Sequence, residues 1–115
     1  GGWEYGSAYV ASKHAVIGLT RCGAQAYAAE GIRVNAVCPS PIDTRMMRSL
    51  EEGLRANMGD AEEPVDVVAA MQASIPAGRY GTPAEVAALV AFLMSDEASF
   101  MNGGVHTIDG GMTSA

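Results

Sequence analysis

The sequence predicts an α/β fold that forms the tail end of a doubly wound parallel sheet. Its elements run helix, strand, two or three helices, strand. An Ala-rich stretch without proline, residues 8–29, leads almost at once into the β-rich residues 32–38. A strand that directly follows a long helix is typical of the second half of a βαβ unit, whose strands are parallel. Two strands are few for such a sheet, so it is completed either by a longer protein or by another chain.

The first helix has predicted ends. Three of residues 1–6 are glycine, so these residues are expected to form a loop, with Ser7 as the N-cap of the helix. Gly31 is its expected C-terminal stop. Apolar and small residues on two faces predict that a sheet and another helix cover it.

Prolines mark the middle of the chain. Pro39-Ser40-Pro41 ends the first strand, at the edge where open α/β sheets have their ligand crevice. Residues 44–61 are expected to form a short amphipathic helix, either a lid over an apolar ligand or a surface helix docked on its own core. Residues 62–74 form the next expected helix, with Pro64 in its first turn, and residues 75–81 a loop.

The strongest local signal is a capping box. Thr82, Pro83 and Glu85 occupy the N-cap, N1 and N3 positions of a predicted helix that ends near residues 95–96. Residues 105–109 then form the last strand, closed by Gly110 and Gly111. We see no linker that would divide two domains.

Tyr9 and Lys13 form the candidate catalytic pair. Residues four apart lie on one helical face, one turn from each other. A positive charge nearby makes a phenol more acidic and so more able to exchange a proton near neutral pH. Alone, such a pair is more often an aromatic residue beside a solvated cation than a catalytic site.

Composition excludes several functions. The net charge of −6 argues against nucleic acid and anionic membrane surfaces as partners. No apolar run is long enough to span a bilayer. Cys22 and Cys38, expected to be buried and unpaired, suit a reduced cytosolic protein. Isolated His14, expected at the surface, and His106 predict no metal site.

Two further groups of residues can be explained without a catalytic role. Glu51-Glu52 and Glu62-Glu63 are expected to be solvated helix starts rather than a pair of catalytic carboxylates. Trp3 and Tyr5 either line a substrate entrance or pack within a loop.

The chain resembles the C-terminal half of a short-chain dehydrogenase/reductase over essentially all 115 residues. Tyr9-x-x-x-Lys13 resembles the family's catalytic helix, and residues 31–39 its sixth strand. Residues 42–44 resemble its nicotinamide loop, residues 79–87 its penultimate helix and residues 103–111 its final strand. A Rossmann-like sheet is therefore expected, without the N-terminal dinucleotide-binding half.

The resemblance implies an oxidoreductase that moves a hydride between NAD or NADP and a carbonyl or secondary alcohol. It implies that Tyr9 exchanges the proton, and that Lys13 assists Tyr9 and binds the nicotinamide ribose. Ile42 and Thr44 would hold the carboxamide, within a cofactor loop that includes Pro39 and Ser40. The family's assembly implies a homo-oligomer, with exchange of elements between copies as one form.

The sequence also departs from the family pattern. No Gly-x-Gly-x-x-Gly loop occurs, the position of the family's catalytic Ser falls before Gly1, and Ser40 stands where Gly is frequent. We therefore expect this chain alone to be inactive. The alternative function is a non-catalytic association module.

Overall fold

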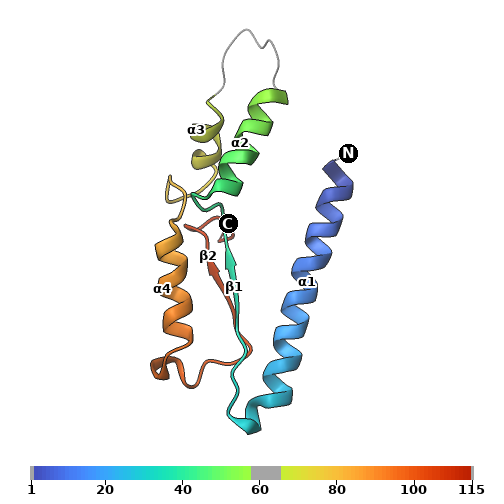
Figure 1. Cartoon of the computed structure of the whole chain (residues 1–115), viewed down its shortest axis with the longest axis vertical. Coiled ribbons are helices and arrows are strands. Elements are labelled where there is room, and N and C mark those ends of the chain that lie inside the picture. Colours follow the sequence, from blue (N-terminus) through green and yellow to red (C-terminus); the bar gives the residue numbers. More distant parts are fainter. Residues whose placement is uncertain (1, 58–65, 115) are drawn as a thin grey trace. The chain divides into compact units, whose positions relative to one another are not determined.

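The computed structural model describes residues 2–57 and 66–114, with side chains from residue 6 onward (Figure 1). In chain order its elements are helix α1 (Gly2–Tyr27), the 3-10 turn η1 (Ala28–Glu30), strand β1 (Ala36–Pro39), helices α2 (Arg45–Asn57), α3 (Val67–Ala73) and α4 (Pro83–Leu93), the 3-10 turn η2 (Asp96–Ala98) and strand β2 (Val105–Ile108). The predicted order of helices and strands is confirmed.

Strands β1 and β2 form a two-stranded sheet. The Ala36 amide donates to the Gly104 carbonyl at 2.9 Å, and the Ser40 amide donates to the Ile108 carbonyl at 3.0 Å. From the first pair to the second, both strands advance by the same number of residues in the same chain direction, so the strands are parallel. Helices α2, α3 and α4 lie in the crossover between them, as a parallel pair requires. The α/β class with a partial Rossmann-like sheet is therefore confirmed.

The chain divides into two compact units. The first comprises Gly1–Val37 and Val90–His106, and the second comprises Cys38–Leu89 and Thr107–Ala115. The division crosses both strands and helix α4. Each unit buries a few side chains: Thr20, Ala24, Ala36, Leu93 and Ala98 in the first, and Glu51, Val67, Ile75 and Tyr80 in the second.

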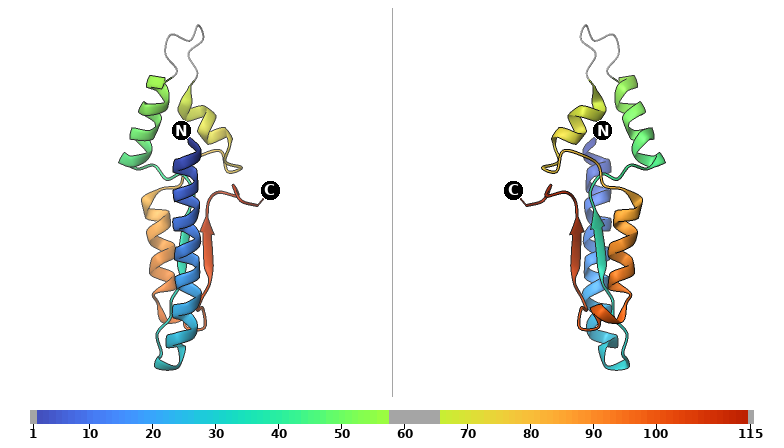
Figure 2. Two further views of the ribbon diagram at one scale, coloured as in Figure 1. Left: turned by 90° about the vertical axis from the view of Figure 1, so that its right-hand side faces the viewer. Right: turned by 90° about the vertical axis from the view of Figure 1, so that its left-hand side faces the viewer.

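Helix α1 begins earlier than predicted and is continuous in both views of Figure 2. The expected loop over residues 2–6 and the expected cap at Ser7 are therefore wrong. No proline interrupts these residues, and a glycine costs a helix only about 1 kcal/mol, so the helix runs through Gly6. The α-helix itself ends at Tyr27, and the predicted stop at Gly31 closes the 3-10 turn η1 that continues it: Gly31 has a φ of 79°, and its amide donates to the Ala28 carbonyl at 3.0 Å.

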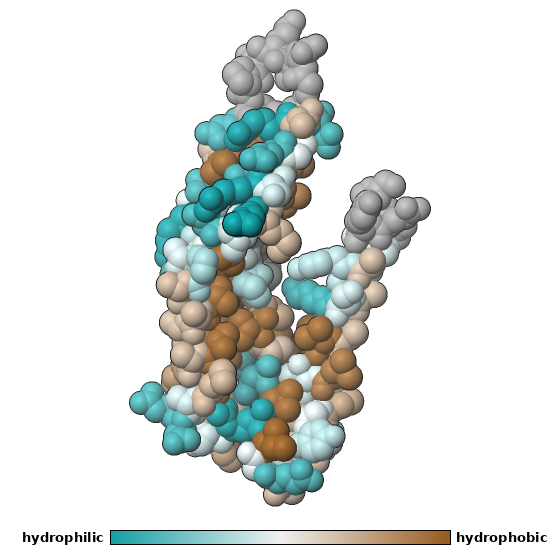
Figure 3. All heavy atoms as spheres, viewed as in Figure 1, coloured by the Kyte–Doolittle hydropathy of each residue, from teal (hydrophilic) through white to brown (hydrophobic). Residues whose placement is uncertain are grey.

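Helix α1 is less covered than expected. Of its described side chains only Thr20 and Ala24 are buried, so the predicted cover on two sides is wrong for this chain. Its C-terminal half is held within the first unit, where the Asn102 amide group donates to the Ala24 carbonyl at 3.2 Å. Figure 3 shows apolar surface left open on this helix. Its exposed apolar side chains are Tyr9, Val10, Val16, Leu19 and Tyr27.

Strand β1 is shorter than the predicted residues 32–38 and begins at Ala36. Side chains replace part of the expected strand pairing before it. The Val34 amide donates to Asn102 Oδ1 at 2.9 Å, and Asn35 Oδ1 accepts from the Gly104 amide at 3.2 Å. The backbone is held in place there without a regular ladder.

The later helices match their predicted residue ranges more closely than α1 does. Helix α2 lies within the predicted residues 44–61, of which 58–61 fall outside the described residues. The predicted start of the next helix, including Pro64, also falls outside them. Helix α3 begins after Asp66, whose Oδ1 accepts from the Ala69 amide at 3.1 Å, a cap that sequence reasoning missed.

Helix α4 begins at Pro83 as predicted. The Glu85 amide donates to Thr82 Oγ1 at 3.2 Å, and the Thr82 amide donates to Glu85 Oε1 at 3.0 Å, which confirms the capping box. The helix ends at Leu93, slightly before the predicted residues 95–96. Among the described helices, none has the length and apolar character needed to cross a membrane.

Candidate functional site

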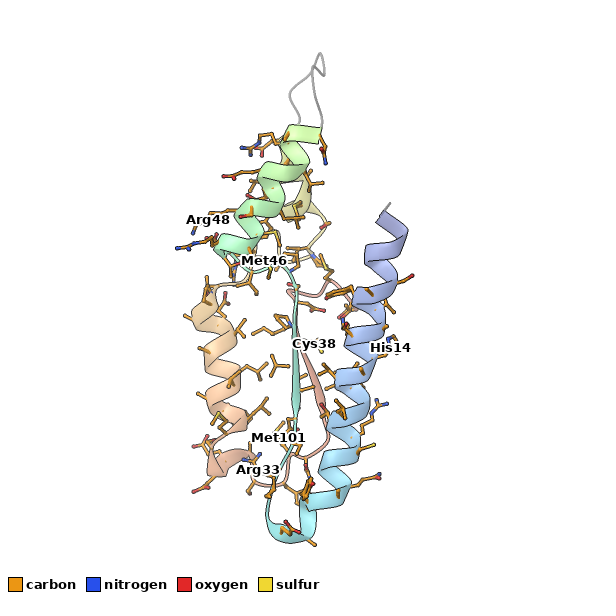
Figure 4. The ribbon with its side chains drawn as sticks, turned by 45° about the vertical axis from the view of Figure 1, so that its right-hand side comes forward. His14, Arg33, Cys38, Met46, Arg48 and Met101 are labelled. Atoms are coloured by element: carbon orange, nitrogen blue, oxygen red, sulfur yellow. The ribbon has the colours of Figure 1, made fainter. Side chains whose placement is uncertain are left out.

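Tyr9 and Lys13 lie one turn apart on helix α1, in the first unit. Both side chains are exposed, Tyr9 by 67%. Their polar neighbours point back to the helix: Ser12 Oγ donates to the Ala8 carbonyl at 2.9 Å, and His14 Nδ1 lies 2.8 Å from the Val10 carbonyl oxygen. His14 is thus a hydrogen-bonded surface histidine, as predicted (Figure 4). The phenol and the ammonium remain open to a ligand.

The predicted cofactor loop lies in the second unit, directly after β1. The Gly81 amide donates to the Pro41 carbonyl at 3.3 Å, and the Asp43 amide donates to the Gly81 carbonyl at 2.9 Å. This parallel bridge opposes Ile42 to Gly81. Ile42's own amide and carbonyl take no partner among the described residues. They could therefore pair with the amide and carbonyl of a carboxamide.

Thr44 has a structural role that sequence reasoning missed. Its Oγ1 accepts from the Met47 amide at 3.2 Å, so Thr44 is the N-cap of helix α2. The hydroxyl keeps its proton, and it can still donate to a ligand oxygen while it caps the helix. Figure 4 shows Met46 and Arg48 on the first turn of α2, immediately beyond this cap.

Ser40 fits the loop without strain. Its amide donates to the Ile108 carbonyl, and its backbone does not adopt the positive φ that would favour glycine. The departure from the family pattern at this position therefore leaves the loop conformation accessible to an L-residue.

The predicted site residues thus fall into two groups. Tyr9 and Lys13 belong to the first unit, and the loop residues Pro39, Ser40, Ile42 and Thr44 belong to the second. The first group provides a phenol and an ammonium for hydroxyl and carbonyl oxygens. The second provides a backbone amide and carbonyl without partners among the described residues, and a hydroxyl, and these groups suit a nicotinamide carboxamide.

Residues 79–81, the 79–81 segment, join several parts of the second unit, and sequence reasoning did not predict this. Arg79 donates to both carboxylate oxygens of Glu85, at 2.8 and 3.0 Å. Tyr80 Oη donates to Glu51 Oε1 at 2.6 Å. Gly81 pairs with the cofactor loop, and a Cβ at this position would lie 2.7 Å from Ile42 Cδ1. Three consecutive residues therefore hold three different parts of the second unit.

Two expectations about single residues are wrong. Glu51 is not solvated but buried, because its position on α2 brings it to the Tyr80 hydroxyl. Cys22 is exposed rather than buried, because α1 is open along most of its length, whereas Cys38 is half-buried. Trp3 and Tyr5 lie in the helix, and the described side chains do not include theirs.

The imidazole of His106 lies beside the Asn35 side chain. Its Oδ1 lies 3.3 Å from His106 Nε2, and its Nδ2 donates to the Met101 carbonyl at 2.9 Å. Among the described residues no group of three or more His, Cys, Asp or Glu side chains could hold a metal ion.

An open hollow of about 380 Å³ lies in the first unit. The Arg33 guanidinium at its wall donates to the Met101 and Ser95 carbonyls, both at 3.2 Å, so its donors are partly engaged within the protein (Figure 4). None of the predicted site residues lines it. Its lining consists of Arg33, Val34, Asn35, Val37, Val90, Leu93 and Met94.

A sequence profile described as "Enoyl-(Acyl carrier protein) reductase" matches residues 1–113. The chain belongs to the short-chain dehydrogenase/reductase family. It is 43% identical over 107 residues to oxidoreductase UcpA of Escherichia coli strain K12, covering 93% of this chain and 39% of UcpA. The chain thus spans about two-fifths of the length of such relatives, and it matches their C-terminal part.

Solved structures of the family share this fold. A short chain dehydrogenase family protein from Francisella tularensis superposes with a TM-score of 0.86 at 38% identity, covering 94% of this chain and 44% of that one. A putative 2-deoxy-d-gluconate 3-dehydrogenase from Agrobacterium tumefaciens, with bound NADP, gives a TM-score of 0.75 at 34% identity and covers 93% and 39%. A 4-hydroxyisoleucine dehydrogenase complexed with NADH gives 0.77 at 31% identity and covers 95% and 40%.

Proposed function

We propose that this chain is the C-terminal part of an oxidoreductase that uses NAD or NADP to interconvert a carbonyl compound and a secondary alcohol. The observation that carries the proposal is the exposed Tyr9–Lys13 pair on helix α1, whose spacing matches the family's Tyr-x-x-x-Lys pattern. Solved relatives with NADP and with NADH support either dinucleotide. Membership of the family supports oxidoreduction in general.

Tyr9 is the proton-exchanging group in this proposal. The bound nicotinamide supplies or accepts the hydride. The Tyr9 hydroxyl donates its proton to the carbonyl oxygen during reduction and takes a proton back during oxidation. The Lys13 ammonium favours the phenolate that forms and hydrogen-bonds the ribose hydroxyls. Both roles need groups that solvent and ligands can reach, as these are.

The loop after β1 holds the carboxamide and so fixes the face of the nicotinamide ring. The amide and carbonyl of Ile42 pair with it, and the Thr44 hydroxyl donates to it while capping α2. Pro39 and Ser40 form the start of this loop, and the pairing of Ser40 with β2 keeps its backbone in place.

The proposed substrate is a small molecule, and we place the enzyme in the cytoplasm as a homo-oligomer. Two free cysteines, one exposed and one half-buried, are consistent with a reducing compartment. The open apolar side of α1 supports association. Strand β1 pairs with β2 alone among the described residues, so its other edge is available to a further strand or an exchanged element.

The same open surface favours a second candidate, a non-catalytic association module. Leu19 is 72% exposed and Val16 is 55% exposed, on a helix that buries little within this chain. A protein of this kind would self-associate but would not oxidise or reduce a substrate.

The deciding experiment replaces Tyr9 by Phe in a full-length protein that contains this chain. Oxidation of 2-deoxy-D-gluconate, 4-hydroxyisoleucine and cyclohexanol is followed with NAD⁺ and NADP⁺. Loss of a general acid–base group lowers kcat/KM by about 100-fold or more, while the Kd of the reduced cofactor stays within about twofold. Tyr27→Phe, an exposed tyrosine on the same helix, is the matched control. Full activity in Tyr9→Phe would rule out the proposed mechanism, and no turnover by the wild type would favour the association module.

A further inference from the structure

A buried hydrogen bond ties helix α2 to the 79–81 segment. Tyr80 Oη donates to Glu51 Oε1 at 2.6 Å, and each residue is only 8% exposed. The two residues are far apart in sequence, and both belong to the second unit. Among the described residues, this is the side-chain hydrogen bond that joins α2 to the segment.

By itself, this bond is expected to add little to the free energy of unfolding. A buried carboxylate loses its hydration, and a pair of apolar residues in its place is often equally stable. Removing only one partner leaves a buried polar group without a hydrogen bond, which is costly. A buried bond of this kind is better suited to fixing one geometry, because only one rotation of α2 brings Glu51 to the Tyr80 hydroxyl.

The Tyr80 hydroxyl is kept as a donor. Burial, the hydrogen bond to Glu51, and the negative charges of Glu51 and Asp43 raise the pKa of Tyr80 to about 12. Its proton therefore remains in place throughout the physiological pH range. Arg48 lies 3.7 Å from Asp43 at the surface and pairs with that carboxylate instead of with Glu51.

The same segment also holds the proposed cofactor loop. Gly81, the residue after Tyr80, pairs with Pro41 and Asp43, and Thr44 immediately afterwards caps α2. Helix α2 is thus joined to the cofactor loop at its first turn, through the Thr44 cap and the surface Arg48–Asp43 pair, and it also contacts α3. Glu51 is the residue that ties its middle to the 79–81 segment. On α2 a stripe of apolar side chains, each four residues from the next, remains open: Met46 (81% exposed), Leu50 (50%) and Leu54 (42%).

We propose that Glu51 and Tyr80 are positioning residues that set the affinity for the carbonyl or alcohol substrate. Their hydrogen bond fixes the rotation of α2, and hence the direction of the Met46, Leu50 and Leu54 stripe, relative to the loop that holds the nicotinamide. This proposal rests on the proposed function, because a substrate must react beside that loop. Neither residue takes part in the chemical step.

The first test follows backbone hydrogen exchange in the 115-residue chain and needs no activity. Tyr80→Phe is expected to speed exchange of the α2 amides by about tenfold or more, since a hydrogen bond to a charged group is lost. The amides of α1 are expected to be unchanged. Glu51→Gln keeps an acceptor oxygen and is expected to retain protection within about threefold of wild type. Tyr27→Phe is the matched control.

The second test measures kinetics in the full-length protein with the best of the three probe alcohols. Tyr80→Phe is expected to raise KM for the alcohol by about tenfold, with kcat and the Kd of NADH or NADPH within about twofold. Glu51→Gln is expected to restore a KM close to that of the wild type. If Tyr80→Phe does not fold, Tyr80→Phe/Glu51→Leu leaves no unpaired buried group and is expected to show the same raised KM.

Unchanged α2 exchange in Tyr80→Phe would overturn the proposal, and so would faster α2 exchange with an unchanged KM. A fall in kcat together with weaker cofactor binding would also overturn it, because the bond would then support the cofactor loop rather than the substrate. If the wild type turned over none of the alcohols, the proposed function and the substrate part of this inference would fail. The exchange data would still decide whether the bond holds α2.

Discussion

At the scale of single residues, Glu85 is an exposed charge whose pKa is strongly lowered. It accepts from the Arg79 guanidinium at 2.8 and 3.0 Å and from the Thr82 amide at 3.0 Å. These bonds, with that of Arg79 the largest, lower the pKa of Glu85 from the ordinary 4.5 to about 2. The ionised form is therefore the one that caps helix α4.

A pH titration tests this directly. Because the pKa of Glu85 is lower in the folded state, its contribution is complete above about pH 4.5 and is lost as the pH falls through about 2. In the folded chain the carboxyl carbon of Glu85, followed by NMR, is expected to titrate near pH 2, with the Thr82 amide resonance changing in parallel. Arg79→Met is expected to move the midpoint upward. A wild-type midpoint at the ordinary value would contradict the pairing.

Residue-level prediction succeeded where the partners are close in sequence. Thr82 and Glu85 are separated by the fixed geometry of one helical turn, so spacing alone identified their reciprocal bonds. Glu51 and Tyr80 are joined only because the chain folds back, so no local pattern predicts that Glu51 is buried. Tyr9 and Lys13 were proposed from spacing and family resemblance, and their catalytic roles stay predictions.

At the scale of elements, helix α1 is the one whose surroundings differ most from expectation. Composition correctly predicted a long helix but not how much of it remains open. Small residues predict close packing without saying which chain supplies the partner. Strand β1 shows the opposite case: the β-rich residues before Ala36 are ordered by the side chains of Asn35 and Asn102, which no periodicity reveals.

A charge placed on the open side of α1 is expected to separate folding from association. Leu19→Glu replaces a side chain that is 72% exposed, so the free energy of unfolding of the chain is expected to change by less than about 0.5 kcal/mol. Self-association is expected to fall, because a carboxylate resists burial in an interface. Light scattering at matched concentrations measures the assembly, and urea unfolding measures the stability.

Gln25→Glu is the control for this prediction. It adds the same charge at another exposed position of α1 without removing apolar surface. If Leu19→Glu and Gln25→Glu weakened association equally, charge rather than the apolar side would be responsible. A wild-type chain that stayed monomeric would contradict the role proposed for this helix.

At the scale of the whole molecule, the two groups of site residues lie in separate units of a chain that spans about two-fifths of its relatives. This chain contains no Gly-x-Gly-x-x-Gly loop to bind a pyrophosphate. We therefore expect the isolated chain to bind NADH and NADPH weakly and to reduce carbonyl compounds negligibly. Fluorescence titration with each nucleotide and an absorbance assay measure this.

A full-length protein containing the chain is the matching positive control. Tight binding or ready turnover by the 115-residue chain would show that residues 1–115 hold more of the cofactor site than we propose. The overall α/β order was predictable because helix, strand and capping signals occur in a distinctive sequence. The division into units was not, because it depends on how sparsely the elements pack.

The 79–81 segment has a consequence for how this protein can vary over evolution. Arg79, Tyr80 and Gly81 are adjacent, and each meets a different partner: Glu85, Glu51 and the backbone around Ile42. If one residue were inserted or deleted here, the residues of the segment would shift by one position relative to their partners, and all three contacts would be lost together. We therefore expect homologous genes to accept new side chains in this stretch more readily than a change in its length.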